Sequence, residues 1–165
     1  PMLRPLLLAA LLPFVGCSAP AQVDPGDGPV IGPQIPSGPA AERSPDLDAA
    51  RERWADAGLD TYTMTLQRIC FCPSPDYTGP FEVTVRDGAV ETVRLDGATV
   101  DDERGVSVDD LFALIEEAYE RNAARVELEF HPELGYPTSL GIDYDTMMAD
   151  EEIAYRVSDL RASDR

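Results

Sequence analysis

The sequence predicts a mixed α+β domain in which an antiparallel sheet carries two helices on one of its faces. Two segments repeat apolar residues at helical spacing, and six segments alternate apolar with polar residues, as half-buried strands do. These segments follow one another in the order helix, strand, strand, strand, and the order occurs twice. We therefore expect a duplicated αβββ unit whose two copies share one sheet.

The first helix is predicted to begin at residues 44–46. Ser44 is a typical N-cap, Pro45 suits the first helical position, and Asp46 lies where the helix dipole favours an acid. Gly58 supplies a stop signal. The apolar residues that share one face between these ends are Leu47, Ala50, Trp54 and Ala57.

Three strands are predicted after this helix, at 61–67, 81–86 and 89–95. In the first of them Tyr62, Met64 and Leu66 alternate with threonines and a glutamine, which is typical of a half-buried strand. Asp87-Gly88, between the second and the third, is a tight hairpin signal.

The second half repeats this pattern. Ser107 and Asp110 form a predicted capping box that opens a helix, and Asn122 can close it. The apolar stripe of this helix consists of Leu111, Phe112, Leu114, Ile115, Ala118 and Tyr119. Strands are then predicted at 125–130, 140–144 and 153–157.

The face of the sheet turned away from the helices is expected to be polar, and either wet or bound to a partner. Its predicted residues are Thr61, Thr63, Thr65, Glu82, Thr84, Arg86, Glu127 and Glu129. The candidate binding surface combines residues of this face with aromatic residues of the loops, namely Thr63, Thr65, Thr84, Phe71, Tyr77 and Tyr136.

Residues 1–16 are typical of an export signal. An apolar run of ten residues follows Arg4, and ten residues are too few to cross a membrane, which needs about 20. The run ends at Phe14-Val15-Gly16-Cys17, which resembles the lipobox of bacterial lipoproteins, although that motif usually has leucine where Phe14 stands. The resemblance implies acyl chains such as palmitate on Cys17 and a lipid anchor in the membrane of the cell envelope. The alternative is an ordinary secretory signal.

Residues 17–45 predict a tether. From Ser18 to Pro45 the chain has seven prolines and four glycines in 28 residues, a composition that cannot bury enough apolar surface to fold. Residues 46–160 have the size of a single domain, and 161–165 are expected to be a tail.

The chain is strongly acidic, with 31 Asp and Glu against 13 basic residues, all of them arginine, and a net charge of −18. This charge argues against a nucleic-acid partner, because phosphate binding needs a basic face. Anionic lipid headgroups would repel the domain as well. The expected partners are therefore the membrane, reached through the lipid on Cys17, and a protein of the envelope.

The chain has three cysteines, and if Cys17 carries lipid, Cys70 and Cys72 remain as a pair. An exported protein is in a compartment where disulfides persist. Residues i and i+2 of a regular strand lie too far apart for a disulfide, so a bond requires a bend, which the prolines that follow favour. A structural disulfide is the leading interpretation. A redox-active pair and a zinc site that includes His131 are the alternatives. His131 is otherwise expected to cap the backbone of its own loop.

Asp143, Asp145 and Asp150 are weak candidates for calcium ligands, because hard oxygen ligands in a loop can hold this ion. The sequence has one histidine and shows no nucleophile elbow, phosphate-binding loop or dinucleotide fingerprint. We therefore expect no enzymatic activity and no cofactor. The expected function is a binding or scaffold module, with thiol–disulfide exchange or calcium binding as alternatives.

Four short motifs occur in order along the chain: Cys70-Phe71-Cys72-Pro73, Val83-Thr84-Val85-Arg86-Asp87-Gly88, Gly135-Tyr136-Pro137 and Ile142-Asp143-Tyr144-Asp145. Together they resemble an uncharacterised family of exported bacterial proteins, often carried on lipoprotein signals. The resemblance covers nearly all of Leu47–Leu160. It implies one domain of unknown function and brings no activity, cofactor or partner.

Overall fold

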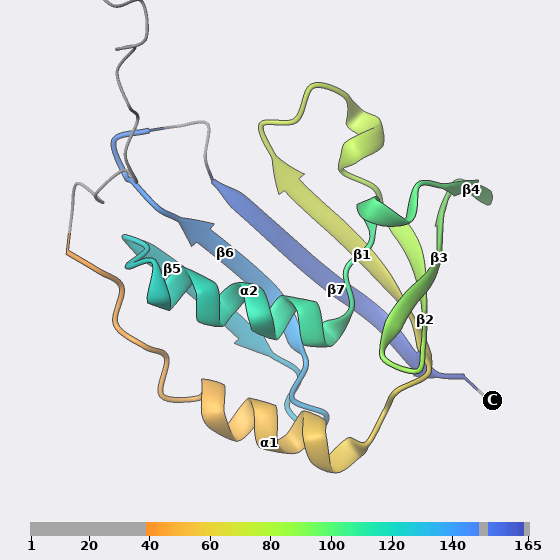
Figure 1. Ribbon diagram of the computed structural model, residues 1–165, viewed down its shortest axis with the longest axis horizontal. Coiled ribbons are helices and arrows are strands. Elements are labelled where there is room, and N and C mark those ends of the chain that lie inside the picture. Colours follow the sequence, from red (N-terminus) through yellow and green to blue (C-terminus); the bar gives the residue numbers. More distant parts are fainter. Residues whose placement is uncertain (1–38, 149–151, 164–165) are drawn as a thin grey trace, which may run out of the picture. The chain divides into compact units, whose positions relative to one another are not determined.

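The structure is a computed structural model that describes residues 39–148 and 152–163. These residues form a mixed α+β domain with two α-helices and one seven-stranded antiparallel sheet (Figure 1), which confirms the predicted α+β class with an antiparallel sheet. The elements in chain order are α1 (Leu47–Ala57), β1 (Tyr62–Cys70), the short 3-10 helix η1 (Pro75–Tyr77), β2 (Phe81–Arg86), β3 (Ala89–Leu95), β4 (Ala98–Val100), the 3-10 helix η2 (Asp102–Arg104), α2 (Val108–Glu120), β5 (Arg125–Phe130), β6 (Pro137–Asp143) and β7 (Ile153–Ala162). Among the described residues, neither helix has the length and apolar character that a membrane crossing needs.

The strand order is β4-β3-β2-β1-β7-β6-β5, and all neighbouring strands are antiparallel. The central pair is β1 and β7, in which Leu66 lies opposite Val157 and Cys70 lies opposite Ile153. The first strand of one predicted repeat thus pairs with the last strand of the other. This pairing does not show whether the two halves are copies of one unit. The duplicated αβββ unit therefore stays a prediction.

Two Asp-Gly turns connect β2, β3 and β4. Asp87 and Gly88 have φ values of 50° and 79°, and Asp96 and Gly97 have φ values of 51° and 81°. Positive φ at both central residues is typical of the type I′ hairpin turn, which aspartate and glycine tolerate. The first hairpin is the predicted one. The second adds β4, a short strand that the sequence analysis did not predict.

The two helices begin differently from each other. In α2 the predicted capping box is present: the backbone N–H of Asp110 donates to Ser107 Oγ (3.1 Å), and that of Ser107 donates to the Asp110 carboxylate (2.8 Å). The expected start of α1 at Ser44 and Pro45 was wrong. These two residues form a turn in which Leu47 N–H donates to the Ser44 carbonyl, and the helix begins at Leu47.

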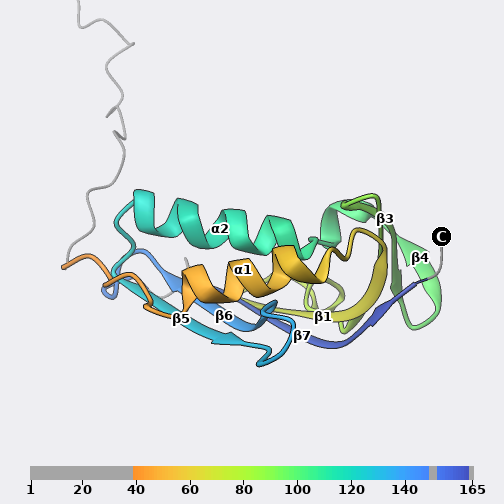
Figure 2. The ribbon, with the colours of Figure 1, turned by 90° about the horizontal axis from the view of Figure 1, so that it is seen from below.

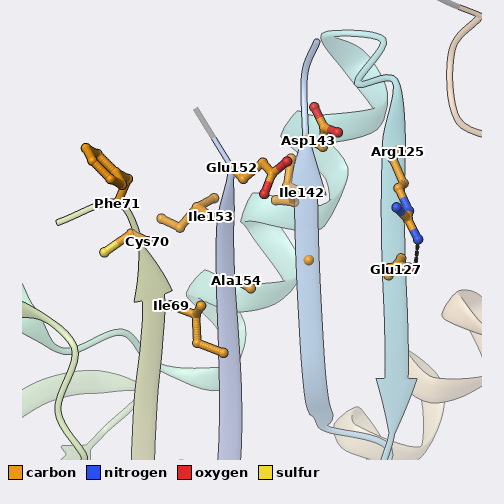
Figure 3. Close-up of a pocket in the computed structure, with 11 residues that line it drawn as sticks. Ile69, Cys70, Phe71, Arg125, Glu127, Ile142, Asp143, Glu152, Ile153 and Ala154 are labelled. Carbon is orange, nitrogen blue, oxygen red and sulfur yellow. Dashed lines mark hydrogen bonds and ion pairs between the residues drawn. The ribbon is translucent and has the colours of Figure 1, made fainter. Parts of the chain in front are cut away.

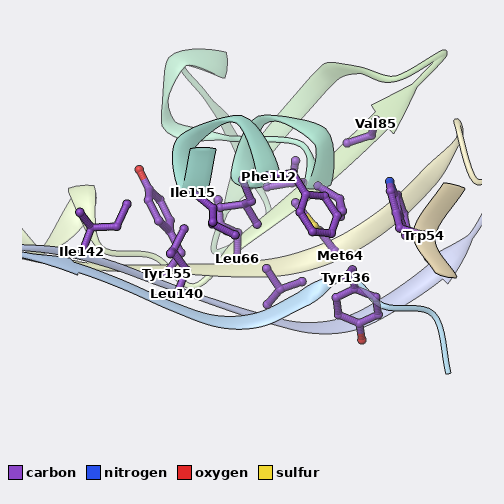
Figure 4. Close-up of a cluster of buried hydrophobic side chains, with 14 of the residues drawn as sticks. Trp54, Met64, Leu66, Val85, Phe112, Ile115, Tyr136, Leu140, Ile142 and Tyr155 are labelled. Atoms are coloured by element: carbon purple, nitrogen blue, oxygen red, sulfur yellow. The ribbon is translucent and has the colours of Figure 1, made fainter. Parts of the chain in front are cut away.

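One face of the sheet, the apolar face, carries the alternating buried side chains Tyr62, Met64, Leu66, Phe81, Val83, Val85, Val93, Leu140, Ile142, Tyr155 and Val157. Both helices contribute side chains that pack among these residues. Trp54 of α1 meets Tyr62 edge-on, and Phe112 of α2 stacks on Phe130 of β5. Figure 2 shows both helices on the same side of the sheet, and Figure 4 shows part of the buried cluster. Burying each large apolar side chain contributes about 1.5–3 kcal/mol to folding.

The other face, the open face, carries the intervening residues of the same strands. Of the residues predicted for it, Glu82, Arg86, Glu127 and Glu129 are exposed, and Thr63, Thr65 and Thr84 are half-buried. Thr61 is buried instead. Its carbonyl accepts a hydrogen bond from Ser163 N–H and its hydroxyl accepts one from Asp87 N–H, so it closes the end of the sheet.

The folded domain begins earlier than the predicted tether boundary. Ala41 N–H donates to the Ala123 carbonyl (2.7 Å), and the Arg43 guanidinium donates to both carboxylate oxygens of Glu116 on α2 (2.7 and 2.9 Å). Residues 41–45, expected to belong to the tether, therefore pack against α2.

At the other end β7 continues to Ala162, which lies opposite Tyr62. Part of the expected tail at 161–165 is thus sheet. The predicted signal at 1–16, the lipidation site Cys17 and most of the tether lie outside the described residues.

Candidate binding groove

A groove of about 350 Å³ crosses the open face near the end of β1, over the strands β7, β6 and β5 (Figure 3). This volume lies near the lower limit for ligand pockets. Ile69 and Phe71 form the apolar side of the groove. Ala154 and Gly141 form a floor of small residues, and Asp143 and Glu127 form a charged side.

The floor is low because two adjacent strands carry small residues. Gly141 of β6 lies opposite Ala154 of β7 in the ladder, and the same row continues to Ile69 on β1 and Glu127 on β5. Side chains within one such row point to the same face of the sheet. Glycine and alanine between isoleucine and glutamate therefore leave a hollow. A β-carbon added to Gly141 would meet nothing nearer than Glu127, at 3.7 Å, so a larger residue would fill the hollow without a backbone clash.

The β1 side of the groove is apolar and exposed. Cys70 and Cys72 lie at disulfide-bonding distance, with Cα atoms 5.1 Å apart, which is shorter than the roughly 6.6 Å between residues i and i+2 of a regular strand. The backbone thus bends at Phe71, whose side chain is 84% exposed, and Ile69 before it is 41% exposed. These aromatic and branched aliphatic side chains form an apolar surface next to the hollow. A partner that covered this surface would remove it from water, which is favourable.

The β5 and β6 side of the groove is charged. Arg125 forms an ion pair with Glu127 on the same strand. Asp143, which lies opposite Arg125 in the ladder, has a buried carboxylate oxygen, Oδ1, without a hydrogen-bond partner among the described residues. Glu152, directly before β7, is exposed and lines the same groove. A buried acceptor without a donor costs about 1–3 kcal/mol, so a ligand that supplied a donor to Asp143 would recover part of that energy.

The predicted threonines lie elsewhere on the open face. Thr63 lies opposite Thr84 and Thr65 lies opposite Glu82, in the part of β1 farther from its end. Thr65 precedes Ile69 by four residues, about 13 Å along a strand. The structure therefore does not bring these threonines together with Phe71 in one site.

Of the two predicted tyrosines, neither lines the groove. Tyr77 in η1 is partly exposed, but the Arg104 guanidinium covers its ring at 4.6 Å from the centroid. Tyr136 is only 5% exposed, because its ring stacks on His131 (4.8 Å between centroids) and meets Trp54 edge-on (6.4 Å). The expectation that Tyr136 offers an exposed contact is corrected: the loop between β5 and β6 packs against α1 and buries the ring.

The structure does not gather the candidate calcium ligands. Asp143 lines the groove, the carboxylate of Asp145 accepts a hydrogen bond from Met147 N–H (3.0 Å), and Asp150 lies outside the described residues. Within residues 39–148 and 152–163 no group of three or more His, Cys, Asp or Glu side chains is placed to hold a metal ion. Calcium binding stays a prediction.

The zinc alternative required the loops after β1 and β5 to converge. These strands run in opposite directions, because β1, β7, β6 and β5 are successive antiparallel neighbours. Because β1 and β5 run in opposite directions, Cys72 and His131, which follow them, lie at opposite ends of the strands. His131 Nδ1 accepts a hydrogen bond from Leu134 N–H (3.1 Å), as expected for a residue that caps its own loop.

Ile69, Ala154 and Gly141 were not identified as site residues from the sequence. Ile69 carries a usable signal, since it is an apolar residue at a polar position of the alternating pattern in β1. Gly141 and Ala154 become neighbours only through the pairing of β6 with β7. That register is not contained in the local pattern of either strand.

The sequence profile of the family described as "Family of unknown function (DUF6174)" matches residues 46–162. No curated protein and no solved structure matches the chain. The matched range runs from the start of α1 to the end of β7 and includes every residue that lines the groove.

Proposed function

Because the chain belongs to the Family of unknown function (DUF6174), no activity comes with its family, and we propose that it is a non-catalytic binding module of the bacterial cell envelope. In this proposal a lipid on Cys17 holds the chain at a membrane surface, a Pro- and Gly-rich tether follows, and the groove on the open face binds an envelope protein.

The observation that carries the binding role is the combination of exposed apolar side chains with a hollow. Phe71 and Ile69 stand beside the floor formed by Gly141 and Ala154. Single exposed apolar residues are common on soluble domains, but a concave apolar spot with charged residues around it is typical of an interaction site. The bend at Cys70 and Cys72 supports the role, because it fixes the backbone that presents Phe71 before any partner arrives.

The anchor is supported by the sequence. A short apolar run ends at Cys17, and more than one acyl chain would hold a protein firmly, whereas one chain gives marginal binding. The net charge of −18 supports a covalent lipid, since the acidic domain itself would be repelled by anionic headgroups.

The anchor is tested by the intact mass of the native protein, measured before and after reduction. We expect a mature chain that begins at Cys17 and exceeds its polypeptide mass by the mass of acyl chains. A Cys17→Ser variant should move from the membrane fraction to the soluble fraction. Mature protein without acyl chains would contradict the tethered part of the proposal.

The binding role is tested by photo-crosslinking in intact cells. A benzoylphenylalanine is introduced at Phe71 and, in a matched control, at Met147, which is 83% exposed and does not line the groove. We expect a discrete crosslinked protein from position 71 and none from position 147. Equal labelling from both positions, or none from either, would count against the groove as the binding site.

A further inference from the structure

We infer that the groove recognises a basic peptide segment, in which an arginine or lysine side chain stands next to a large apolar side chain. This inference rests on the proposed function and deepens it by naming the chemistry of the partner. It follows from three properties of the groove: the charge of one side, the apolar character of the other, and the distance between them.

The charged side selects a cation. Arg125 is engaged with Glu127, which leaves the carboxylates of Asp143 and Glu152 without a basic partner among the described residues. The Asp143 Oδ1 atom is buried and lacks a donor. A guanidinium or ammonium group offers several N–H donors and a positive charge, and hydrogen bonds of this charged kind are about twice as strong as neutral ones.

The opposite side selects an apolar group. Phe71 and Ile69 offer an aromatic face and an aliphatic surface, and an alkyl or aromatic side chain placed on the Ala154–Gly141 floor would lie against Ile69, two residues before Phe71. Burial of apolar surface contributes about 25 cal/mol per Å². The aliphatic stem of an arginine or lysine can also lie along such a floor while its charged head reaches a carboxylate.

The dimensions favour a short peptide over a single small amine. Glu152 directly precedes β7, next to β1, and Asp143 ends β6, two strands from β1. With strands about 4.8 Å apart, the two carboxylates lie roughly 5 and 10 Å across the sheet from β1. One lysine or arginine side chain that reaches the Asp143 carboxylate leaves the apolar side of the groove to a second group. A short peptide supplies both groups, because side chains at i and i+2 of an extended segment lie on the same side, about 6.6 Å apart.

Charge complementarity also excludes other occupants. With a net charge of −18, a second copy of this chain would bring acidic surface toward the Asp143 and Glu152 carboxylates. Nucleic acid and anionic lipid would meet the same repulsion. A basic segment of an envelope protein is the macromolecular partner that the groove favours.

The probes are three fluorescein-labelled peptides of equal length, which repeat Arg-Arg-Leu-Leu (the Arg-Leu peptide), Glu-Glu-Leu-Leu (the Glu-Leu peptide) or Arg-Arg-Ser-Ser (the Arg-Ser peptide), so that each side of an extended chain carries both residue types. Their binding to the full chain in non-ionic detergent is followed by fluorescence anisotropy. We expect the Arg-Leu peptide to bind at least tenfold more tightly than the other two, and its affinity to fall as salt rises, because screening weakens the charge contacts. Equal affinity of the Arg-Leu and Glu-Leu peptides would overturn the inference.

The groove is then filled without removal of any charge. Gly141→Val places a branched side chain on the floor at a position where an added β-carbon meets only Glu127 at 3.7 Å, and it suits a strand. The matched control is Ser139→Val, two residues earlier on the same face of β6 and outside the groove. We expect Gly141→Val to lower the Arg-Leu affinity at least tenfold and Ser139→Val to leave it within twofold. Equal effects of both variants would contradict the assignment of the site.

The charges are tested by Asp143→Asn combined with Glu152→Gln, with Glu129→Gln on the same face outside the groove as control. The double variant should lose about tenfold in affinity and most of the salt dependence, and the control should lose neither. These results separate the inference from the proposed function. If position 71 crosslinks a partner while the Arg-Leu peptide does not bind, the binding role of the groove is supported and the basic-peptide inference is contradicted.

Discussion

The hydroxyl oxygen of Tyr62, in the first position of β1, accepts a hydrogen bond from the backbone N–H of Val108, the first residue of α2 (2.8 Å). Both residues are fully buried. The first N–H groups of a helix have no partner within the helix. Tyr62 therefore satisfies an N–H group of α2 from the sheet and fixes where the helix begins over the apolar face.

Replacing Tyr62 by Phe should lower the free energy of unfolding by about 1–3 kcal/mol, because the Val108 N–H stays buried without an acceptor. The measurement is chemical denaturation followed by the fluorescence of Trp54, which is the single tryptophan and is buried in the fold. Tyr77→Phe, a partly exposed residue, is the control and should change stability little. Equal losses in both variants would contradict the role of the Tyr62 hydroxyl.

Stability should fall at alkaline pH for the same reason. Burial raises the pKa of Tyr62 to about 12, above its ordinary value of 10.0. The folded state thus favours the neutral form of Tyr62. The contribution of Tyr62 to the free energy of unfolding is therefore full below pH 10 and is lost as pH rises toward 12. Burial raises the pKa of Tyr155 and Tyr136 as well, which adds to the loss. We expect denaturation curves from pH 9 to 12 to show a smaller decline for Tyr62→Phe than for the natural chain.

Glu116 should couple stability to acid. Hydrogen bonds from the Arg43 guanidinium lower the pKa of Glu116 below its ordinary value, and Arg51 also pairs with it. A depressed carboxyl pKa gives stability that is present above the unfolded pKa and is lost as pH falls through the folded pKa. Because this site is partly exposed, we expect Glu116→Gln to cost less than about 1 kcal/mol at pH 7. The variant should also unfold with a weaker pH dependence below pH 5.

The control for this acid effect is Glu117→Gln, on the next residue of α2. Glu117 pairs with Arg121 one turn away, and both side chains are more than half exposed. Its removal should change the acid dependence little. If Glu117→Gln and Glu116→Gln behaved alike, the link from residues 41–45 to α2 would not be the source of the effect.

Gly135→Ala should be strongly destabilising. Gly135 has a φ of 79°, and an added β-carbon would lie 2.1 Å from the Ala50 carbonyl oxygen of α1, a contact that neither backbone can allow. Gly97→Ala is a matched control, because Gly97 has a φ of 81° and nothing within 4 Å of the added atom. We expect about 1 kcal/mol of loss for Gly97→Ala from the backbone conformation alone. Gly135→Ala should lose about 1–3 kcal/mol more from the clash.

The pair Cys70 and Cys72 should add little to global stability. A bond between residues two apart closes a very short loop, and the stabilisation from restricting the unfolded chain grows with loop length. The double variant Cys70→Ser, Cys72→Ser should lose about 1–2 kcal/mol or less. It should weaken binding of the Arg-Leu peptide more than it weakens the fold, because Phe71 is no longer held. A global loss above about 3 kcal/mol would show that the pair supports the core.

The sequence contains the local features of this fold. The alternation in β1, the capping box at Ser107 and Asp110, and the Asp87-Gly88 turn each depend on residues close together in the chain, and each is present as predicted. The class of fold follows from their order. The features that were missed have non-local or weak signals: β4 has three residues, and the extension of β7 to Ala162 depends on pairing with β1.

The groove could be predicted only in part. Phe71 stands out in the sequence because it lies between two cysteines. Gly141 and Ala154 form a floor only when β6 and β7 pair in register, and nothing local marks that register. Tyr136 was assigned to an exposed loop because loops are usually exposed. The aromatic contacts with Trp54 and His131 that bury its ring depend on how the loop packs against α1.

The contact between Ala41 and Ala123 has a practical consequence for anyone who attaches a reporter to this protein. Ala123 lies two residues before Arg125 at the groove, so a bulky group attached directly at Ala41 would lie near the end of β5 that borders the groove. Ser163, in contrast, bonds to Thr61 at the start of β1, eight residues or roughly 26 Å along the strand from Ile69. Immobilisation or labelling through the C-terminal side therefore leaves the groove accessible.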